Sequence, residues 1–147
     1  MARALQPLSF CRSQSVAADA EPAEVLTRHA AHPNLALNLS TLLSFGRPPT
    51  PDSILQSVSY VLSELPRRLA TRVRSFEALP FIVGTNPYVA NTLNAYRESF
   101  KRLVSYPPVR SINENADFAA CLEVLVQNHA NDIPSLAKGY EFGAQLS

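Results

Sequence analysis

The sequence predicts an all-α protein that folds as an antiparallel helical bundle. Apolar residues recur at three- and four-residue spacing along three long stretches, which is the period of one helix face. Two of these stretches begin with a threonine or asparagine followed by proline, a common helix start. The connections between the stretches are short, and short loops join antiparallel neighbours in bundles.

Two short helices are expected before the first long one. Pro22 can open a helix that runs through Ala30, because proline is tolerated in the first turn. A second helix is expected near Leu39 to Phe45. It should end at Gly46, since glycine readily adopts the left-handed conformation that stops a helix.

The first long helix has a strong start signal and an unusual interior. Thr50 can cap it, Pro51 suits its first position, and Asp52 complements the helix dipole. Pro66 lies in its interior, where a proline costs about 3 kcal/mol, so a bend is expected there. The helix should end near Leu79. Its apolar face comprises Ile54, Val58, Val61, Leu62, Leu65, Leu69, Val73 and Phe76.

Asn86 and Pro87 repeat the start signal for the second long helix, and Pro107 and Pro108 stop it. The run of three apolar residues at 81–83 is too short to assign as a strand. The apolar seam of the second long helix comprises Val89, Leu93, Tyr96, Phe100 and Leu103.

The third long helix is expected to begin near Asn113 to Asn115, with Phe118, Leu122, Leu125 and His129 on one face. Pro134 should bend or break it, and residues 136–142 continue the helical pattern. His129 has two interpretations. It is either a core histidine satisfied by one hydrogen bond, or part of a polar pocket inside the bundle.

Composition excludes several classes of protein. The 147 residues fit one domain, and the net charge of +1 gives no drive toward nucleic acid or membranes. No stretch approaches the roughly 20 apolar residues of a membrane-spanning helix. His29 and His32 lack a third ligand nearby, so no metal site is expected, and the four scattered glycines form no phosphate-binding loop.

Charge is unevenly distributed along the chain. The first long helix carries a basic block of Arg67, Arg68, Arg72 and Arg74, which is either a solvated face or a contact surface. Residues 1–18 contain arginine and serine but no acid. That composition is typical of a mitochondrial targeting segment, here assigned to residues 1–20, or of an ordinary disordered terminus. Residues 22–147 would form the helical domain.

Five segments, in this order and spacing, resemble the N-terminal domain of the mitochondrial 2-oxoacid dehydrogenase kinases, of the pyruvate and branched-chain types. The resemblance covers roughly residues 24–142. The segments are LLSFG at 42–46, ELPRRLATR at 64–72, LPFIVGTNPYV at 79–89, AYRESF at 95–100 and NHANDIPSLAKG at 128–139.

The resemblance implies a fold and a function. Family members are matrix enzymes that phosphorylate serines on the E1 subunit of a dehydrogenase complex, most often the pyruvate complex, and so inactivate it. Their N-terminal domain is a bundle of the four-helix type that docks on the lipoyl domain of the complex core. ATP and Mg²⁺ bind a separate C-terminal domain, so this chain is expected to need no cofactor, to hold no catalytic residue and to be inactive alone.

The resemblance also assigns two sets of site residues. Lipoyl-binding positions correspond to Leu37, Leu42, Phe45 and Tyr60. Positions of an internal pocket for a 2-oxoacid effector correspond to Leu69, Tyr96, Ser99, Leu125 and His129. Ordinary core packing is the alternative for both sets. The family's last bundle helix would follow Ser147, so an incomplete bundle is expected, and a non-catalytic helical adaptor for the lipoyl domain is the alternative function.

Overall fold

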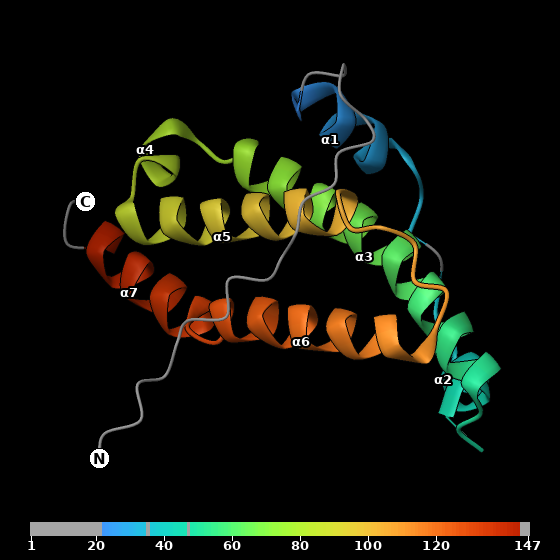
Figure 1. Cartoon of the computed structure of the whole chain (residues 1–147). Helices are drawn as coiled ribbons and strands as arrows, with labels where there is room; N and C mark the ends of the chain where they lie inside the picture. The colour runs from blue at the N-terminus through green and yellow to red at the C-terminus, as the bar shows by residue number, and fades with distance from the viewer. Residues whose placement is uncertain (1–21, 35, 47, 145–147) are drawn as a thin grey trace, which may run out of the picture.

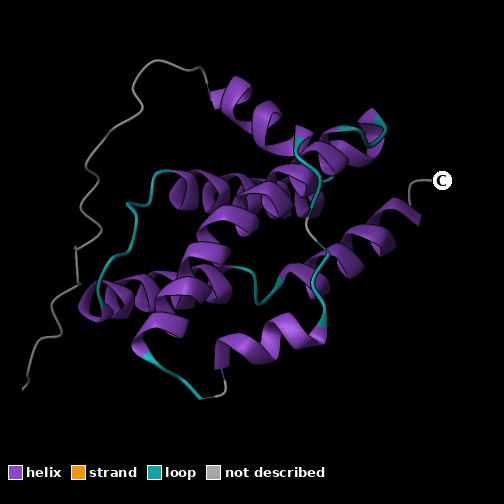
Figure 2. Cartoon of the chain, turned by 90° about the vertical axis from the view of Figure 1, so that its right-hand side faces the viewer, coloured by secondary structure: helices purple, strands orange, loops and turns teal. Residues whose placement is uncertain are grey.

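Helices and connecting loops make up the described part of the chain, which comprises residues 22–34, 36–46 and 48–144 of a computed structural model (Figures 1 and 2). These residues contain no strand, which confirms the all-α class. The expected targeting segment at 1–20 lies outside the described residues. The helices are α1 Pro22–Ala31, α2 Leu39–Gly46, α3 Pro51–Glu77, α4 Phe81–Gly84, α5 Pro87–Val104, α6 Ile112–Asn128 and α7 Asp132–Ala144.

Helix α3 begins where the sequence predicts. The Thr50 hydroxyl accepts a hydrogen bond from the Ser53 amide at 3.2 Å, and the Ser53 hydroxyl accepts one from the Thr50 amide at 2.9 Å. This reciprocal pair satisfies two amides that a helix start leaves without partners. The helix passes through Pro66 without interruption and ends at Glu77, two residues earlier than expected. Its bend stays a prediction.

Helix α6 begins earlier than the sequence analysis places it. Ser111 is its cap, accepting a hydrogen bond from the Glu114 amide at 3.3 Å, while the Glu114 carboxylate accepts one from the Arg110 amide at 2.7 Å. The expected start near Asn113 was therefore wrong by one to three residues. A serine followed three residues later by glutamate is a start signal that the apolar pattern alone does not reveal.

Pro134 neither bends nor breaks α6. The chain leaves that helix at Asn128 and starts α7 at Asp132, so Pro134 falls in the first turn of a new helix. Proline is harmless there, because amides of the first turn have no partner inside the helix. Residues 81–83, which had no assignment, form the short helix α4.

Helix α3 is the centre of the fold. It packs against α5, α1, α2 and α6, while α7 packs against α5. Figure 1 shows α3, α5 and α6 running in alternating directions, as expected for an antiparallel arrangement. Two groups of buried residues form the core, and partly buried Leu69 of α3 contacts both. The groups are Leu26, Ala70, Val73 and Phe100, and Val58, Leu103, Phe118 and Leu125.

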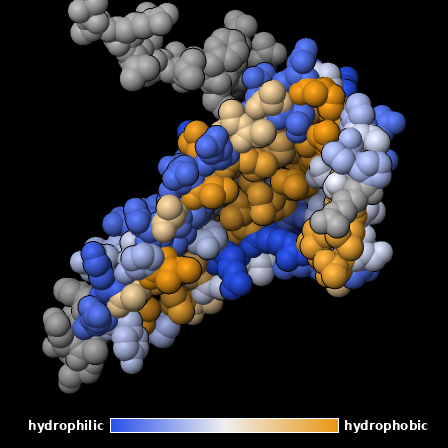
Figure 3. All heavy atoms as spheres, turned by 90° about the horizontal axis from the view of Figure 1, so that it is seen from below, coloured by the Kyte–Doolittle hydropathy of each residue, from blue (hydrophilic) through white to orange (hydrophobic). Residues whose placement is uncertain are grey.

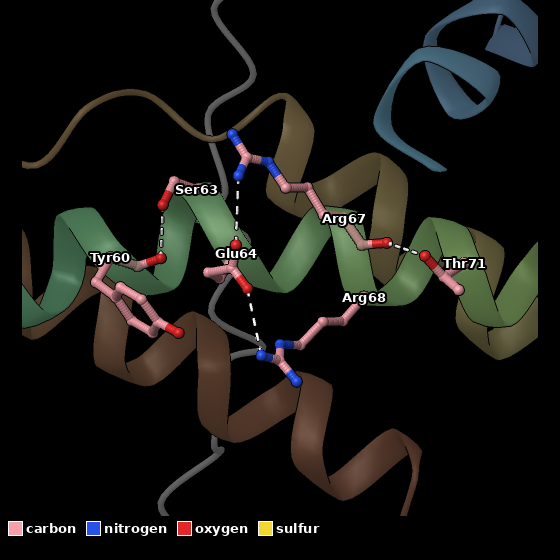
Figure 4. A network of polar contacts seen from close by, with 6 residues as sticks. All are labelled: Tyr60, Ser63, Glu64, Arg67, Arg68 and Thr71. Carbon is pink, nitrogen blue, oxygen red and sulfur yellow. Dashed lines mark hydrogen bonds and ion pairs between the residues drawn. The ribbon is translucent and has the colours of Figure 1, made fainter. Parts of the chain in front are cut away.

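A buried acid pairs with two of the four arginines in the basic block on α3. The Glu64 side chain is 2% exposed, and its two carboxylate oxygens pair with Arg67 and Arg68, each at 3.3 Å. Figure 4 shows the two guanidinium groups reaching this carboxylate from opposite sides. Arg74 pairs with Glu77 at 3.5 Å. The block is therefore a set of local ion pairs, not a uniformly free basic face.

Candidate functional site

Helix α2 presents leucines to solvent. None of its residues is buried, and Leu39, Leu42 and Leu43 are 70%, 52% and 46% exposed. Leu37, just before the helix, is 40% exposed. Isolated exposed leucines are common on protein surfaces, but four within seven residues concentrate apolar surface in one segment, and exposed apolar patches mark interaction sites. We call Leu37, Leu39, Leu42 and Leu43 the α2 patch.

The α2 patch is held against α3 by an aromatic contact. The rings of Phe45 and Tyr60 lie with centroids 5.7 Å apart, and α2 packs on α3. Asn38 fixes the start of α2, since its side-chain oxygen accepts hydrogen bonds from the Thr41 amide at 2.8 Å and the Thr41 hydroxyl at 2.9 Å. The Tyr60 hydroxyl is buried and has no hydrogen-bond partner among the described residues.

Two of the four residues predicted to bind the lipoyl group are in contact. Phe45 and Tyr60 are partly buried and in contact, whereas Leu37 and Leu42 are exposed and are not core residues. Sequence reasoning missed Leu39 and Leu43, although their four-residue spacing places them on a shared side of the helix. Leu39 and Leu43 belong to the patch because they are exposed to solvent, and the apolar pattern of the sequence does not indicate which leucines are exposed.

A second group of polar side chains gathers around His129. Its Nε2 atom lies 2.8 Å from the Ser99 hydroxyl, and its Nδ1 atom lies 2.6 Å from a carboxylate oxygen of Asp132. The ring of Tyr96 is 4.7 Å away, centroid to centroid. Residues of α5, of the turn after α6 and of α7 thus meet at one imidazole. We call Tyr96, Ser99, His129 and Asp132 the histidine cluster.

The location of His129 differs from the expectation. It is not on the face of α6 but is the residue that ends this helix, with its amide bonded to the Val126 carbonyl at 3.1 Å. The turn aims its ring at Ser99. Asp132 was missed, although its three-residue separation from His129 is a spacing at which side chains meet in helices and turns.

Asp132 determines which nitrogen of His129 carries the proton. A carboxylate only accepts hydrogen bonds, so the hydrogen on Nδ1 donates to it. In the neutral ring Nε2 is then the acceptor for the Ser99 hydroxyl. In the protonated ring Nε2 becomes a donor and the hydroxyl oxygen accepts. This tautomer is assigned from the partners, as hydrogen positions normally are.

An open cavity of about 440 Å³ lies beside the histidine cluster, between α5 and α6. Its lining contains Ser99 and Leu125 of the predicted effector set. Leu69, Tyr96 and His129 do not line it. Sequence reasoning missed Arg102, which lines the cavity beside Glu98 and adds a guanidinium group. The lining residues are Asn94, Ala95, Glu98, Ser99, Arg102, Leu125 and Asn128.

Residues 22–34, 36–46 and 48–144 offer neither a metal site nor a membrane-spanning helix. No group of three or more histidine, cysteine or acidic side chains in these ranges is arranged to hold a metal ion. No helix in the same ranges has the length and apolarity to cross a membrane.

Known proteins provide relatives for most of this chain. Residues 36–144 match the family model of the mitochondrial branched-chain alpha-ketoacid dehydrogenase kinase. A mitochondrial [pyruvate dehydrogenase (acetyl-transferring)] kinase of Arabidopsis thaliana is 28% identical over 103 residues, which are 70% of this chain and 28% of the relative. A kinase of the same name from Schizosaccharomyces pombe is 28% identical over 75 residues, or 51% of this chain and 18% of the relative.

The family match includes α2, α3, α5, α6 and α7, and therefore both the α2 patch and the histidine cluster. The chain spans about a quarter or less of the length of the curated relatives it matches. With the helical fold and the ordered segments of the sequence, these matches show that the chain belongs to the mitochondrial branched-chain alpha-ketoacid dehydrogenase kinase family, in its N-terminal domain.

Proposed function

We propose that this chain is the docking and regulatory region of a mitochondrial protein-serine kinase. The kinase would phosphorylate and inactivate the E1 subunit of a 2-oxoacid dehydrogenase complex, with the pyruvate complex favoured by the two curated relatives. Both relatives are named as mitochondrial enzymes, which supports a mitochondrial location, here the matrix. ATP and Mg²⁺ would bind a separate domain of the kinase, as the family resemblance implies.

The observation that carries the docking proposal is the α2 patch. A lipoyl group consists of a dithiolane ring on an aliphatic arm, so its partner surface must be apolar and accessible. The four leucines supply such a surface, and Phe45 of the same helix contacts Tyr60 of α3.

Binding to the lipoyl domain of the complex core tests this proposal directly. Titration calorimetry should show that the chain binds a lipoylated domain more tightly than the same domain without lipoate. Phe45→Ala should weaken binding of the lipoylated form, because it removes half of the aromatic contact. Phe81→Ala is the matched control, since Phe81 is 86% exposed on α4 and remote in sequence from the patch. Equal binding of both domain forms would overturn the docking role.

We further propose that the cavity beside the histidine cluster takes a small 2-oxoacid effector. Arg102 can pair with a carboxylate, and the amide groups of Asn94 and Asn128 can donate to it or to the oxo group. Ser99 connects the cavity to His129.

Pyruvate can serve as the probe for this second role. The ring protons of His129 should shift in NMR spectra as pyruvate is added, and Arg102→Gln should weaken binding about tenfold, as expected for loss of a hydrogen bond to a charged group. Arg110→Gln, at an exposed arginine outside the cavity, should leave the affinity unchanged. Equal weakening by both variants would indicate general charge attraction and no effector site.

A further inference from the structure

A smaller pocket lies between α1, the middle of α3 and the C-terminal end of α5. Its volume is about 320 Å³, and His29, Leu62, Pro66, Leu103 and Val109 are among its lining residues. It shares no residue with the 440 Å³ cavity or with the α2 patch. Its size is at the lower end of the range for small-molecule sites. The walls combine aliphatic side chains with the hydroxyl-bearing residues Ser59, Ser63 and Tyr106.

His29 brings an unsatisfied nitrogen to this pocket. Its ring lies edge-on against Phe100, with centroids 5.5 Å apart, and its buried Nδ1 atom has no hydrogen-bond partner among the described residues. Burial lowers the pKa of His29, and the positive charges of Arg67, His32 and Arg28 lower it further. The ring is thus neutral at pH 7. In the neutral tautomer that carries its hydrogen on Nε2, the Nδ1 atom is a hydrogen-bond acceptor without a donor among the described residues.

Pro66, which lines the pocket, also removes one backbone hydrogen bond from the middle of α3. In a regular helix the amide of residue 66 would bond to the carbonyl of Leu62, but proline has no amide hydrogen to donate. Leu62 and Pro66 both line the pocket, as residues four apart share a helix face. The proline inside α3 therefore both fills the pocket wall and withholds the usual partner from the Leu62 carbonyl.

We propose that this pocket binds a small neutral ring compound that carries one hydroxyl group, of which a phenol is the simplest example. The ring would lie against the aliphatic part of the walls, and the hydroxyl would donate to Nδ1 of His29. Positive charge from Arg67 and Arg28 disfavours cations at this position. A carboxylate ion has no hydrogen to donate to Nδ1 of His29.

A pair of probes isolates the hydroxyl group. In calorimetric titrations of the 147-residue chain, 4-methylphenol should bind saturably. Its methyl ether, 4-methylanisole, has the same ring but no donor, and it should bind about three- to tenfold more weakly, the value of one neutral hydrogen bond. Equal affinity for the two compounds, or no saturable binding of either, would overturn the proposal without any variant.

Variants then locate the binding position. His29→Phe keeps a ring beside Phe100 but removes Nδ1, so it should reduce the affinity for 4-methylphenol to that for 4-methylanisole. His32→Phe is the matched control on the same helix, at an exposed position, and should change nothing. Unchanged 4-methylphenol binding in His29→Phe, with the native unfolding midpoint retained, would contradict the assignment. Phe45→Ala should not affect this binding, so the result is independent of lipoyl docking.

Discussion

At the residue scale, Glu64 shows how a buried charge depends on its partners. Its carboxylate is almost fully removed from water and pairs with Arg67 and Arg68, whose side chains are 29% and 41% exposed. Removing the partners of a buried ion destabilises a protein by about 3–5 kcal/mol, because the charge is left uncompensated. Removing Glu64 should destabilise the fold much less, because water can solvate the guanidinium groups of Arg67 and Arg68.

This asymmetry predicts a rescue. Arg67→Met with Arg68→Met should lower the free energy of unfolding in urea by about 3–5 kcal/mol. Adding Glu64→Gln to that double variant should restore part of the loss, because no charge then remains buried. Arg74→Met, at a pair whose arginine is 57% exposed, should change the unfolding free energy by less than about 1 kcal/mol. A triple variant no more stable than the double one would refute this account.

His29 predicts a pH dependence of stability. Its pKa in the folded chain is below the ordinary value of 6.5, chiefly because of burial and then because of Arg67, His32 and Arg28. As pH falls below about 6.5, the unfolded chain takes up a proton before the folded chain does, so unfolding becomes more favourable. The loss ends below the folded pKa, where both states are protonated.

Urea unfolding at pH 7.5 and pH 5.5 measures this effect. His29→Phe should make the decrease in stability between the two pH values smaller than in the natural chain, whereas the exposed His32→Phe should leave the decrease close to its natural size. An equal decrease in the natural chain and in His29→Phe would show that other groups, such as the carboxylates, govern acid stability in this range.

At the element scale, one contact joins α7 to the start of α5. The side-chain amide group of Asn86 donates a hydrogen bond to the Gly139 carbonyl at 2.8 Å. The side-chain oxygen of Asn86 accepts one from the backbone amide of Tyr88 and so caps α5. A Cβ atom added at Gly139 would lie 3.2 Å from Cβ of Tyr88 and 3.3 Å from the Asn86 side-chain oxygen. Two segments of the family resemblance, TNPYV and AKG, therefore contribute to a single junction.

Gly139→Val should destabilise the chain by about 1–3 kcal/mol, as expected for overpacking at a close contact. Ala137→Val, on the exposed side of α7, is the control and should change stability by less than about 0.5 kcal/mol. Thermal unfolding followed by circular dichroism compares the two. Equal melting temperatures for both variants would mean that α7 can move away from α5 without loss of thermal stability.

The helices themselves were largely predictable from local sequence signals. Thr50 and Asn86, each followed by proline, correctly gave the starts of α3 and α5, because caps act within three residues. The start of α7 was not predictable from the apolar pattern, since helical periodicity continues across the turn at 129–131. Apolar periodicity indicates which residues share one face of a helix, but it does not indicate where one helix ends and the next begins.

The site residues were predictable in part, for a related reason. The family resemblance named Tyr96, Ser99 and His129, which the structure brings into contact, and it missed Asp132 and Arg102. Asp132 lies only three residues from His129, but the apolar pattern does not reveal the turn that brings the two together. Arg102 gains its role by facing α6 across the cavity. Contacts between helices far apart in sequence are not encoded in the spacing within any one of them.

At the scale of the whole molecule, the described chain has a substantial core but leaves a large amount of apolar surface in contact with solvent. The α2 patch is one part, and on α4 Phe81 and Ile82 are 86% and 75% exposed. Figure 3 shows a hollow floored by hydrophobic residues and bordered by hydrophilic ones on the face seen from below. Apolar surfaces of this kind bind hydrophobic dyes and promote association between molecules.

The folded chain should therefore bind the dye ANS while still unfolding cooperatively. Leu39→Ser with Leu43→Ser, and separately Phe81→Ser with Ile82→Ser, should each reduce ANS fluorescence, since each pair removes exposed apolar side chains. Neither pair should shift the urea midpoint much, because exposed residues contribute little to the core. A cooperative transition with reduced fluorescence would place the dye on the native surface. Unchanged fluorescence in both variants, together with a broad transition, would instead indicate dye in a loosely packed core.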